Sequence, residues 1–235
     1  MLKVREREDA GIHTKNFCLD IFKKQEKVGF TDDWASYVSG TLLEAGFDTT
    51  ASIFLTFAVA MINFPEVQKR AQAEVDAICG NRLPTMADEP NMQYIISVLS
   101  SKRLFGIFRL AFSALCPMLL PMQTLTTGYH FPAKTGMMIN VWAFNNNPER
   151  YPNPRVFDPM RHINDYTRAQ VSATLIDPWK RNHFTFGVGR RVCPGLNIVE
   201  QSLFLGIAYM LWAFTITSEL DANGGLIPVS TEVVT

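Results

Sequence analysis

Phe184-Thr-Phe-Gly-Val-Gly-Arg-Arg-Val-Cys-Pro-Gly195 is a short loop that runs straight into an apolar stretch. Gly187 and Gly189 can take positive φ angles, so this loop can turn tightly. Apolar residues then recur at helical spacing, which predicts one buried helix: Leu196, Val199, Leu203, Ile207, Met210, Leu211 and Phe214. Cys193 is therefore expected where that helix begins.

Cys193 lies in surroundings that favour its ionised form. The start of a helix gathers unpaired N–H groups and the positive end of the helix dipole. Together with Arg190 and Arg191, these groups are expected to lower the pKa of the thiol, which suits a ligand for a soft or redox metal. The plainer alternative is a buried cysteine that only packs. A phosphate-binding loop is disfavoured, because Val192 stands where a dinucleotide motif needs its third glycine.

The loop fits the pattern F-x-x-G-x-R-x-C-x-G at every fixed position: Phe186, Gly189, Arg191, Cys193 and Gly195. It resembles the cysteine-ligand loop of the cytochromes P-450, the haem-thiolate monooxygenases. The resemblance implies that Cys193 is the axial ligand of the iron in haem b, and that Arg191 pairs with a haem propionate. It also implies that the rest of the loop, including Gly187, lies against the haem.

A second unusual stretch, Ala45-Gly-Phe-Asp-Thr-Thr50, lies inside a long helix that is expected from about Thr31 to Asn63. Glycine, aspartate and threonine are poor residues for a helix interior, and local exceptions of this kind often mark a functional site. The small residues would leave a shallow bed for a flat cofactor. A threonine hydroxyl there can bond back to a helix carbonyl.

This stretch is similar to A/G-G-x-D/E-T-T/S, a motif of the oxygen-binding helix of the cytochromes P-450. The resemblance implies that Ala45 and Gly46 contact the haem, and that Asp48 and Thr49 deliver protons to bound oxygen. A helix kink without chemistry is the alternative for this stretch taken alone. Both motifs occur in the order in which the family carries them.

Composition narrows the classes of protein further. The chain has 235 residues, of which 47% are hydrophobic, enough for a sizeable core. Lysine plus arginine and aspartate plus glutamate both number 22, so the net charge is zero and nothing suggests a nucleic-acid partner. The cysteines are widely spaced, which argues against a disulfide scaffold or a zinc cluster: Cys18, Cys79, Cys116 and Cys193.

The remaining patterns predict a mainly α fold with small β elements, which resembles the C-terminal half of the P-450 fold. The expected elements are one or two amphipathic helices in residues 1–29, helices at 65–80 and 91–99, a hairpin of Tyr129–Phe131 with Met137–Phe144, and an irregular, proline-rich stretch at 145–163. On the helix at 65–80, Glu74 is expected to face water.

One family feature is missing. The P-450 helix that carries E-x-x-R aligns so that Ser101 and Leu104 replace its charged pair, and no acidic residue lies between Glu89 and Glu149. Arg161 matches the arginine that joins this pair in the family, although a solvated loop arginine is the alternative.

Residues 1–99 and 127–235 thus resemble the family, whereas residues 100–126 do not. A reading-frame or splicing error and a true divergent segment both explain this difference. The chain is expected to form one incomplete P-450 domain over residues 1–235, without the N-terminal half.

The resemblance implies insertion of one oxygen atom from O₂ into a small hydrophobic organic substrate. Electrons would come from NAD(P)H through a reductase. The chain as written is expected to be a weak or inactive enzyme. An inactive haem-binding relative and a non-enzymatic helical binding module are the alternatives.

No membrane span is expected. The first residues are charged and do not resemble a signal peptide. The apolar run at 49–64 is short, and the run at 110–133 is interrupted by prolines. For a eukaryotic protein the resemblance implies the cytosolic face of the endoplasmic-reticulum membrane, but no anchor is expected in this chain, which leaves a cytosolic or unknown location.

Overall fold

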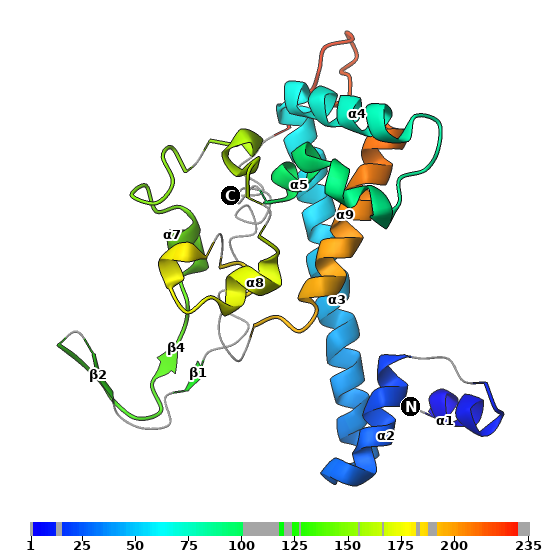
Figure 1. The fold of residues 1–235 in the computed structure, drawn as a ribbon, viewed down its shortest axis with the longest axis vertical. Coiled ribbons are helices and arrows are strands. Elements are labelled where there is room, and N and C mark those ends of the chain that lie inside the picture. The colour runs from blue at the N-terminus through cyan, green and yellow to red at the C-terminus, as the bar shows by residue number, and fades with distance from the viewer. Residues whose placement is uncertain are drawn as a thin grey trace. The chain divides into compact units, whose positions relative to one another are not determined.

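The structure is a computed structural model of the 235-residue chain (Figure 1). It describes residues 2–12, 16–100, 118–119, 124–126, 128–154, 156–165, 167–181, 184–187 and 192–229. The chain divides into two compact units, Met1–Thr50 and Ala51–Thr235, and each is described by itself. Helix α3, Asp32–Asn63, contributes to both units. The expectation of one incomplete domain stays a prediction.

The first unit is helical, as expected. Helix α1 spans Leu2–Asp9 and helix α2 spans Phe17–Val28. Asn16 caps α2, because its side-chain oxygen accepts the N–H of Leu19 at 2.9 Å. The hydroxyl of Thr31 accepts an N–H from the first turn of α3 at 3.4 Å. The helix start expected at Thr31 is therefore confirmed.

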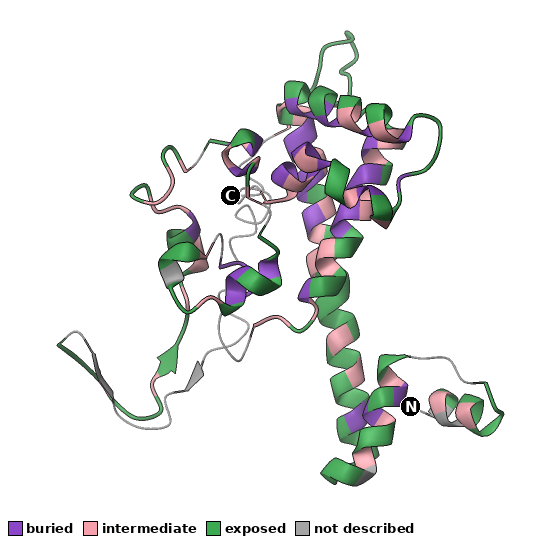
Figure 2. Ribbon diagram, in the orientation of Figure 1, coloured by how far each residue is buried: buried purple, intermediate pink, exposed green. Residues whose placement is uncertain are grey.

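The part of α3 that belongs to the first unit leaves large apolar side chains in water (Figure 2). Four of them are between 67% and 77% exposed: Trp34, Tyr37, Leu43 and Phe47. By helical spacing, Trp34 and Tyr37 lie on one side of α3, whereas Leu43 and Phe47 lie on another. The exposed side chains therefore do not form a single apolar face.

The core of the second unit lies where three helices and the end of α3 meet. The three are α4, Pro65–Cys79, α5, Gln93–Ser100, and α9, Leu196–Ala213. Helices α4 and α5 lie against α9 and against each other (Figure 1). Eight of the largest buried apolar side chains belong to one cluster: Phe57, Met61, Val75, Met92, Ile95, Val98, Phe204 and Ile207. The helices expected in these three places are confirmed.

Helices α3 and α9 come close to each other at Gly206. A Cβ atom added there would overlap the ring of Phe54, which packs against the same core. By length and composition alone, both helices could also cross a membrane. That is weak evidence, since core helices of soluble proteins pass the same test. The absence of a membrane span therefore stays a prediction.

The strands pair differently from the expected hairpin. Strand β3, Tyr129–Phe131, is antiparallel to β2, Thr124–Thr126, and β4, Gly136–Met137, is antiparallel to β1, Met118–Leu119. The expected pairing of β3 with residues 137–144 is wrong. Gly128 precedes β3 with a φ of 83°. A positive φ suits a tight hairpin turn at this point, rather than at the turn that follows β3.

Residues 141–145 form a helix rather than a strand. Helix α7 spans Val141–Asn145, and Asn140 caps it by accepting the N–H of Ala143 at 2.9 Å. In the described part of the proline-rich stretch that follows, the regular element is one short 3-10 helix, η2, Pro159–His162. The expectation that this stretch lacks long regular structure is confirmed.

Glu74 faces water only in part, contrary to expectation. Its carboxylate accepts the N–H groups of Tyr94 and Ile95, at 2.8 and 2.9 Å, in the first turn of α5. These N–H groups have no partner inside their own helix, so α4 caps α5. In the middle of α5, the hydroxyl of Ser97 donates to the carbonyl oxygen of Pro159 in η2.

Candidate functional site

Cys193 lies between the glycine-rich loop and α9, as predicted. Its N–H donates to the carbonyl oxygen of Phe186 at 2.9 Å, and the N–H of Gly187 donates to that of Phe184 at 3.0 Å. Gly187 has a φ of 76°, as the expected tight turn requires. Gly195 is the cap residue of α9. Among the described residues, Cys193 is thus held by a backbone bond to Phe186 and lies two residues before the cap of α9.

The thiol of Cys193 is free and half-buried. A Cβ atom added at Gly195 would lie 3.9 Å from its Sγ atom, so the glycine keeps space open beside the sulfur. Within the part of the chain that the structure describes, no group of three or more His, Cys, Asp or Glu side chains could hold a metal ion. A metal here would therefore rely on Cys193 and on a cofactor that brings its other ligands.

An apolar cluster lies against this loop. Helix α8, Ala169–Thr174, was not expected from the sequence, and it packs against α9. Their buried residues form one cluster with Phe186, and Cys193 and two valines pack against it: Ala169, Ala173, Phe186, Leu196, Val192 and Val199. Phe186 is 7% exposed. The phenylalanine of the motif is therefore a packing residue in the cluster against which Cys193 lies.

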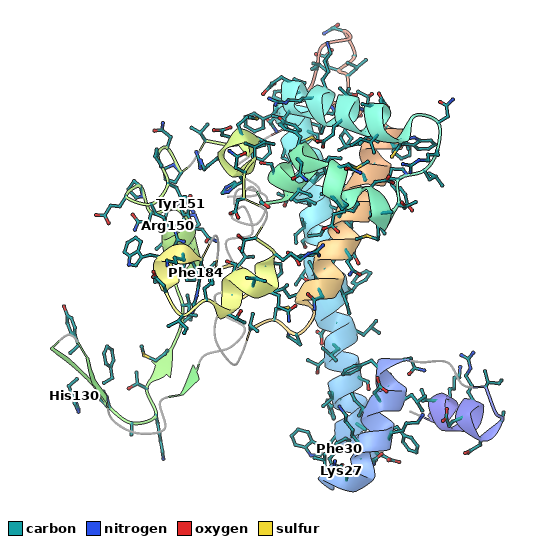
Figure 3. All side chains as sticks on the ribbon, in the orientation of Figure 1. Lys27, Phe30, His130, Arg150, Tyr151 and Phe184 are labelled. Atoms are coloured by element: carbon teal, nitrogen blue, oxygen red, sulfur yellow. The ribbon has the colours of Figure 1, made fainter. Side chains whose placement is uncertain are left out.

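Asn145 and Arg150 contact the other end of the loop, and Figure 3 shows Arg150 beside Phe184 and Tyr151. The N–H of Phe184 donates to the side-chain oxygen of Asn145 at 3.2 Å, and the amide of Asn145 donates to the hydroxyl of Thr185 at 3.3 Å. The guanidinium of Arg150 lies 5.5 Å from the ring centroid of Phe184 and 5.2 Å from that of Tyr151. Sequence reasoning missed these residues, although a run of three asparagines is a signal of contacts to the backbone.

The second motif lies on α3 within the first unit. The hydroxyl of Thr49 donates to the carbonyl oxygen of Ala45 at 2.6 Å, which confirms the expected back-bonding. The carboxylate side chain of Asp48 is exposed. Nothing lies within 4 Å of a Cβ atom added at Gly46, so the bed of small residues is open. Proton delivery by Asp48 and Thr49 stays a prediction.

Six residues named in the sequence argument lie outside the described residues: Ser101, Leu104, Cys116, Gly189, Arg190 and Arg191. Arg161 is described, and it donates to the carbonyl oxygens of Pro152 and Asn153, both at 3.0 Å. Its side chain is half-buried at the surface of the loop. Both bonds come from one nitrogen of the guanidinium and go to neighbouring loop carbonyls, which fits the alternative of a loop arginine.

A sequence model of the Cytochrome P450 family matches residues 2–224. This chain belongs to the cytochrome P450 family. Cytochrome P450 monooxygenase virE of Hypocrea virens is 40% identical to it over 225 residues, which are 95% of this chain and 40% of the relative. Cytochrome P450 monooxygenase fsoB of Humicola fuscoatra is 41% identical over 211 residues, covering 88% and 39% respectively.

Solved P450 structures agree with this assignment. A zebra fish cytochrome P450 solved with abiraterone superposes with a TM-score of 0.66 at 26% identity. The match covers 78% of this chain and 40% of that one. It confirms the mainly α fold with small β elements as a partial P450 fold. This P450 chain spans about 40% of the length of the relatives it matches.

Proposed function

We propose that this chain binds haem b through Cys193 and serves a P450 monooxygenase that oxidises a small hydrophobic organic substrate. The observation that carries this proposal is the free, half-buried thiol of Cys193, with its N–H bonded to Phe186 at the start of α9. Family membership supports it, because haem, iron and monooxygenase chemistry are properties of the P450 family.

The residues of the loop fit the cofactor. Cys193 would hold the iron through Sγ, and Phe186 belongs to the apolar cluster that packs against Cys193. Gly187 and Gly195 carry no side chain, so a flat group can approach the backbone, and Arg191 is assigned to a propionate. When bound, the haem supplies the O₂-dependent oxidation, with electrons from NAD(P)H delivered by a reductase. The chain supplies ligation, orientation and proton transfer.

Asp48 and Thr49 are proposed to move protons on α3. The exposed carboxylate of Asp48 can exchange protons with water. The hydroxyl of Thr49 is engaged with Ala45 at 2.6 Å, and a hydroxyl has one proton to donate and two lone pairs to accept. Thr49 can therefore pass a proton on by turning away from Ala45 while it accepts another. Ala45 and Gly46 are proposed to leave the space for the haem.

Membership of the P450 family is the basis for the substrate class and the cellular location that we propose for this chain. Zebra fish P450 structures solved with abiraterone and with progesterone support a small hydrophobic ligand. For a eukaryotic protein, the cytosolic face of the endoplasmic-reticulum membrane is proposed, and a cytosolic location is the alternative because no anchor is expected in this chain. Fractionation of the tagged chain decides between them: a membrane-bound tag supports the first location, and a tag confined to the soluble fraction supports the second.

We also propose that the chain as it stands is a weak or inactive enzyme, which keeps an inactive haem-binding relative as the second candidate. Two observations favour it. No carboxylate lies between Glu89 and Glu149, where the family carries its E-x-x-R pair. Trp34 and Phe47 are exposed on α3, so water reaches the helix that is assigned to oxygen chemistry. A non-enzymatic helical module is not favoured, because the family match spans residues 2–224.

The test is a haem titration of the 235-residue chain with the variants Cys193→Ala and Cys18→Ala. Cys18 is also a free, half-buried cysteine, so its variant is a matched control. We expect haem uptake with a thiolate-type spectrum of the reduced carbon monoxide complex in the wild type and in Cys18→Ala, and loss of that spectrum in Cys193→Ala. An unchanged spectrum in Cys193→Ala overturns the ligand assignment.

A turnover assay with a reductase separates the two candidates. Haem binding without product supports the inactive relative. Sustained product formation by the chain alone, with one haem per chain, contradicts the proposed impairment and shows that residues 100–126 are a working segment.

A further inference from the structure

Glu200 joins α9 to α8 beside the cysteine loop. Its Oε1 atom accepts the N–H of Ala169, the first residue of α8, at 2.8 Å. Its Oε2 atom is buried and has no hydrogen-bond partner among the described residues. Burial is the main cause that raises the pKa of this carboxyl, and the N–H of Ala169 acts in the opposite direction. A carboxyl kept in such surroundings needs a compensating contact, and Ala169 provides one.

The carboxyl lines a small cavity of about 70 Å³ between four elements. The cavity wall contains Phe186 of the cysteine loop together with residues of α5, α8, α9 and the 3-10 helix η1, Met86–Asn91. An ion pair of 3.1 Å between Arg168 and Glu89 ties the start of α8 to η1. Glu200 and this exposed ion pair are thus two polar contacts that hold the start of α8.

Helix α8 depends on these contacts. It has six residues, and helices of that length are not stable by themselves. Its first N–H groups have no partner inside the helix, so the bond from Ala169 to Glu200 fixes where α8 begins. The exposed pair of Arg168 contributes little, because surface ion pairs are weak.

A chain of contacts leads from Glu200 to the cysteine. Ala169 and Ala173 of α8 pack with Phe186 in the cluster against which Cys193 lies. The carbonyl oxygen of Phe186 accepts the N–H of Cys193 at 2.9 Å. A shift of α8 would therefore move the support of the cysteine.

We propose that Glu200 is a positioning residue for Cys193: by accepting the N–H of Ala169 it fixes α8 on α9, and the apolar cluster between these helices holds the cysteine loop in place. The role of Cys193 as iron ligand rests on the proposed function, whereas the position of its thiol does not. Two measurements test these two statements separately.

The first readout is the rate at which each thiol is alkylated in the haem-free chain, measured by mass spectrometry. Cys193 is half-buried against the α8 cluster, whereas Cys79 is 7% exposed in the separate core of α4, α5 and α9. We expect Glu200→Ala to raise the rate at Cys193 about tenfold, as the loss of one charge-assisted hydrogen bond predicts, and to leave Cys79 unchanged. Glu200→Gln keeps an oxygen that can accept the N–H of Ala169, so it should retain the wild-type rate.

Gln201 is an exposed neighbour on α9, and Gln201→Ala is the matched control. Equal acceleration at Cys193 and Cys79 would show general unfolding and would overturn the proposal. So would an unchanged rate in Glu200→Ala, or a Glu200→Gln variant that behaves like Glu200→Ala.

The second readout is the reduced carbon monoxide spectrum of the haem-loaded chain. We expect Glu200→Ala to lose part of the thiolate-type band at equal haem content, and Glu200→Gln and Gln201→Ala to keep it. A full band in Glu200→Ala contradicts the positioning role. A wild-type chain that takes up no haem contradicts the proposed function, while the alkylation result still decides the role of Glu200.

Discussion

Replacing Glu74 with alanine should destabilise the second unit by about 2–3 kcal/mol. The carboxylate accepts the N–H groups of Tyr94 and Ile95 at 2.8 and 2.9 Å, and both groups lose their partner in Glu74→Ala. The loss of one helix cap costs about 1 kcal/mol, and a buried donor without a partner costs about 1–3 kcal/mol. Since the side chain of Glu74 is half-buried, water replaces part of what is lost, which keeps the expected total near the lower values.

The effect should reach the core, because α5 cannot keep its place alone. It has eight residues, which is too short for an isolated helix in water. Ile95 and Val98 of α5 are 0% exposed in the core that α9 shares. For a protein of this size, 1 kcal/mol corresponds to about 2–4 °C in Tm. Thermal unfolding followed by circular dichroism should therefore show a Tm about 4–12 °C lower for Glu74→Ala.

Asp76→Ala is the matched control, because it removes the same charge from an exposed position of α4. It should change the free energy of unfolding by less than about 0.5 kcal/mol. Glu74→Gln keeps one oxygen to accept an N–H and should lose about half as much stability as Glu74→Ala. The reasoning is refuted if Glu74→Ala unfolds at the same temperature as Asp76→Ala, since α5 would then be held by its apolar contacts alone.

Two further predictions concern proton transfer and pH. Thr49→Ala in a haem-loaded, active P450 that contains this chain should lower the rate of product formation by about 10²–10⁴-fold, and an unchanged ratio of product to NAD(P)H consumed would show that Thr49 only shapes the helix. Asp88 accepts from Arg82 and from the N–H of Thr85, which hold its pKa well below the ordinary 3.8. This stabilisation is present above pH 3.8 and is lost as the pH falls towards the lower folded-state pKa. Urea unfolding midpoints should therefore fall less between pH 5 and pH 2 in Asp88→Asn than in the wild type, and equal slopes would contradict the assignment.

The sequence predicted those helices and turns whose formation depends mainly on neighbouring residues. The spacing of apolar residues located α4, α5 and α9, because one face of each helix must be buried. Thr31 and Asn63 located the ends of α3 to within a residue. The cysteine motif also predicted the turn at Gly187 and the position of Cys193 before α9, since both follow from a few adjacent residues.

Contacts between residues far apart in the chain could not be predicted from these patterns. Glu74 looked like a solvent-facing helix residue, but its partners lie 20 and 21 positions along the chain. The prediction of the hairpin was wrong for a related reason. Strand β3 pairs with β2 across Gly128, and the stability of a strand pair depends more on the surrounding contacts than on the residues of the strand itself. Helix α8 is too short for its periodicity to be visible.

The candidate site depends both on a local sequence motif and on contacts between residues far apart in the chain. The motif around Cys193 specifies a chemistry, because it joins a thiol, a helix start and glycines in a few residues. Its geometry depends on residues that the motif does not contain: Asn145 holds one end of the loop, and Ala169 with Glu200 holds the cluster beneath the other. A chain can therefore keep the motif intact and still misplace its thiol if these contacts are lost. We therefore expect the proposed haem binding to depend on contacts of α7, α8 and α9 as well as on the motif itself.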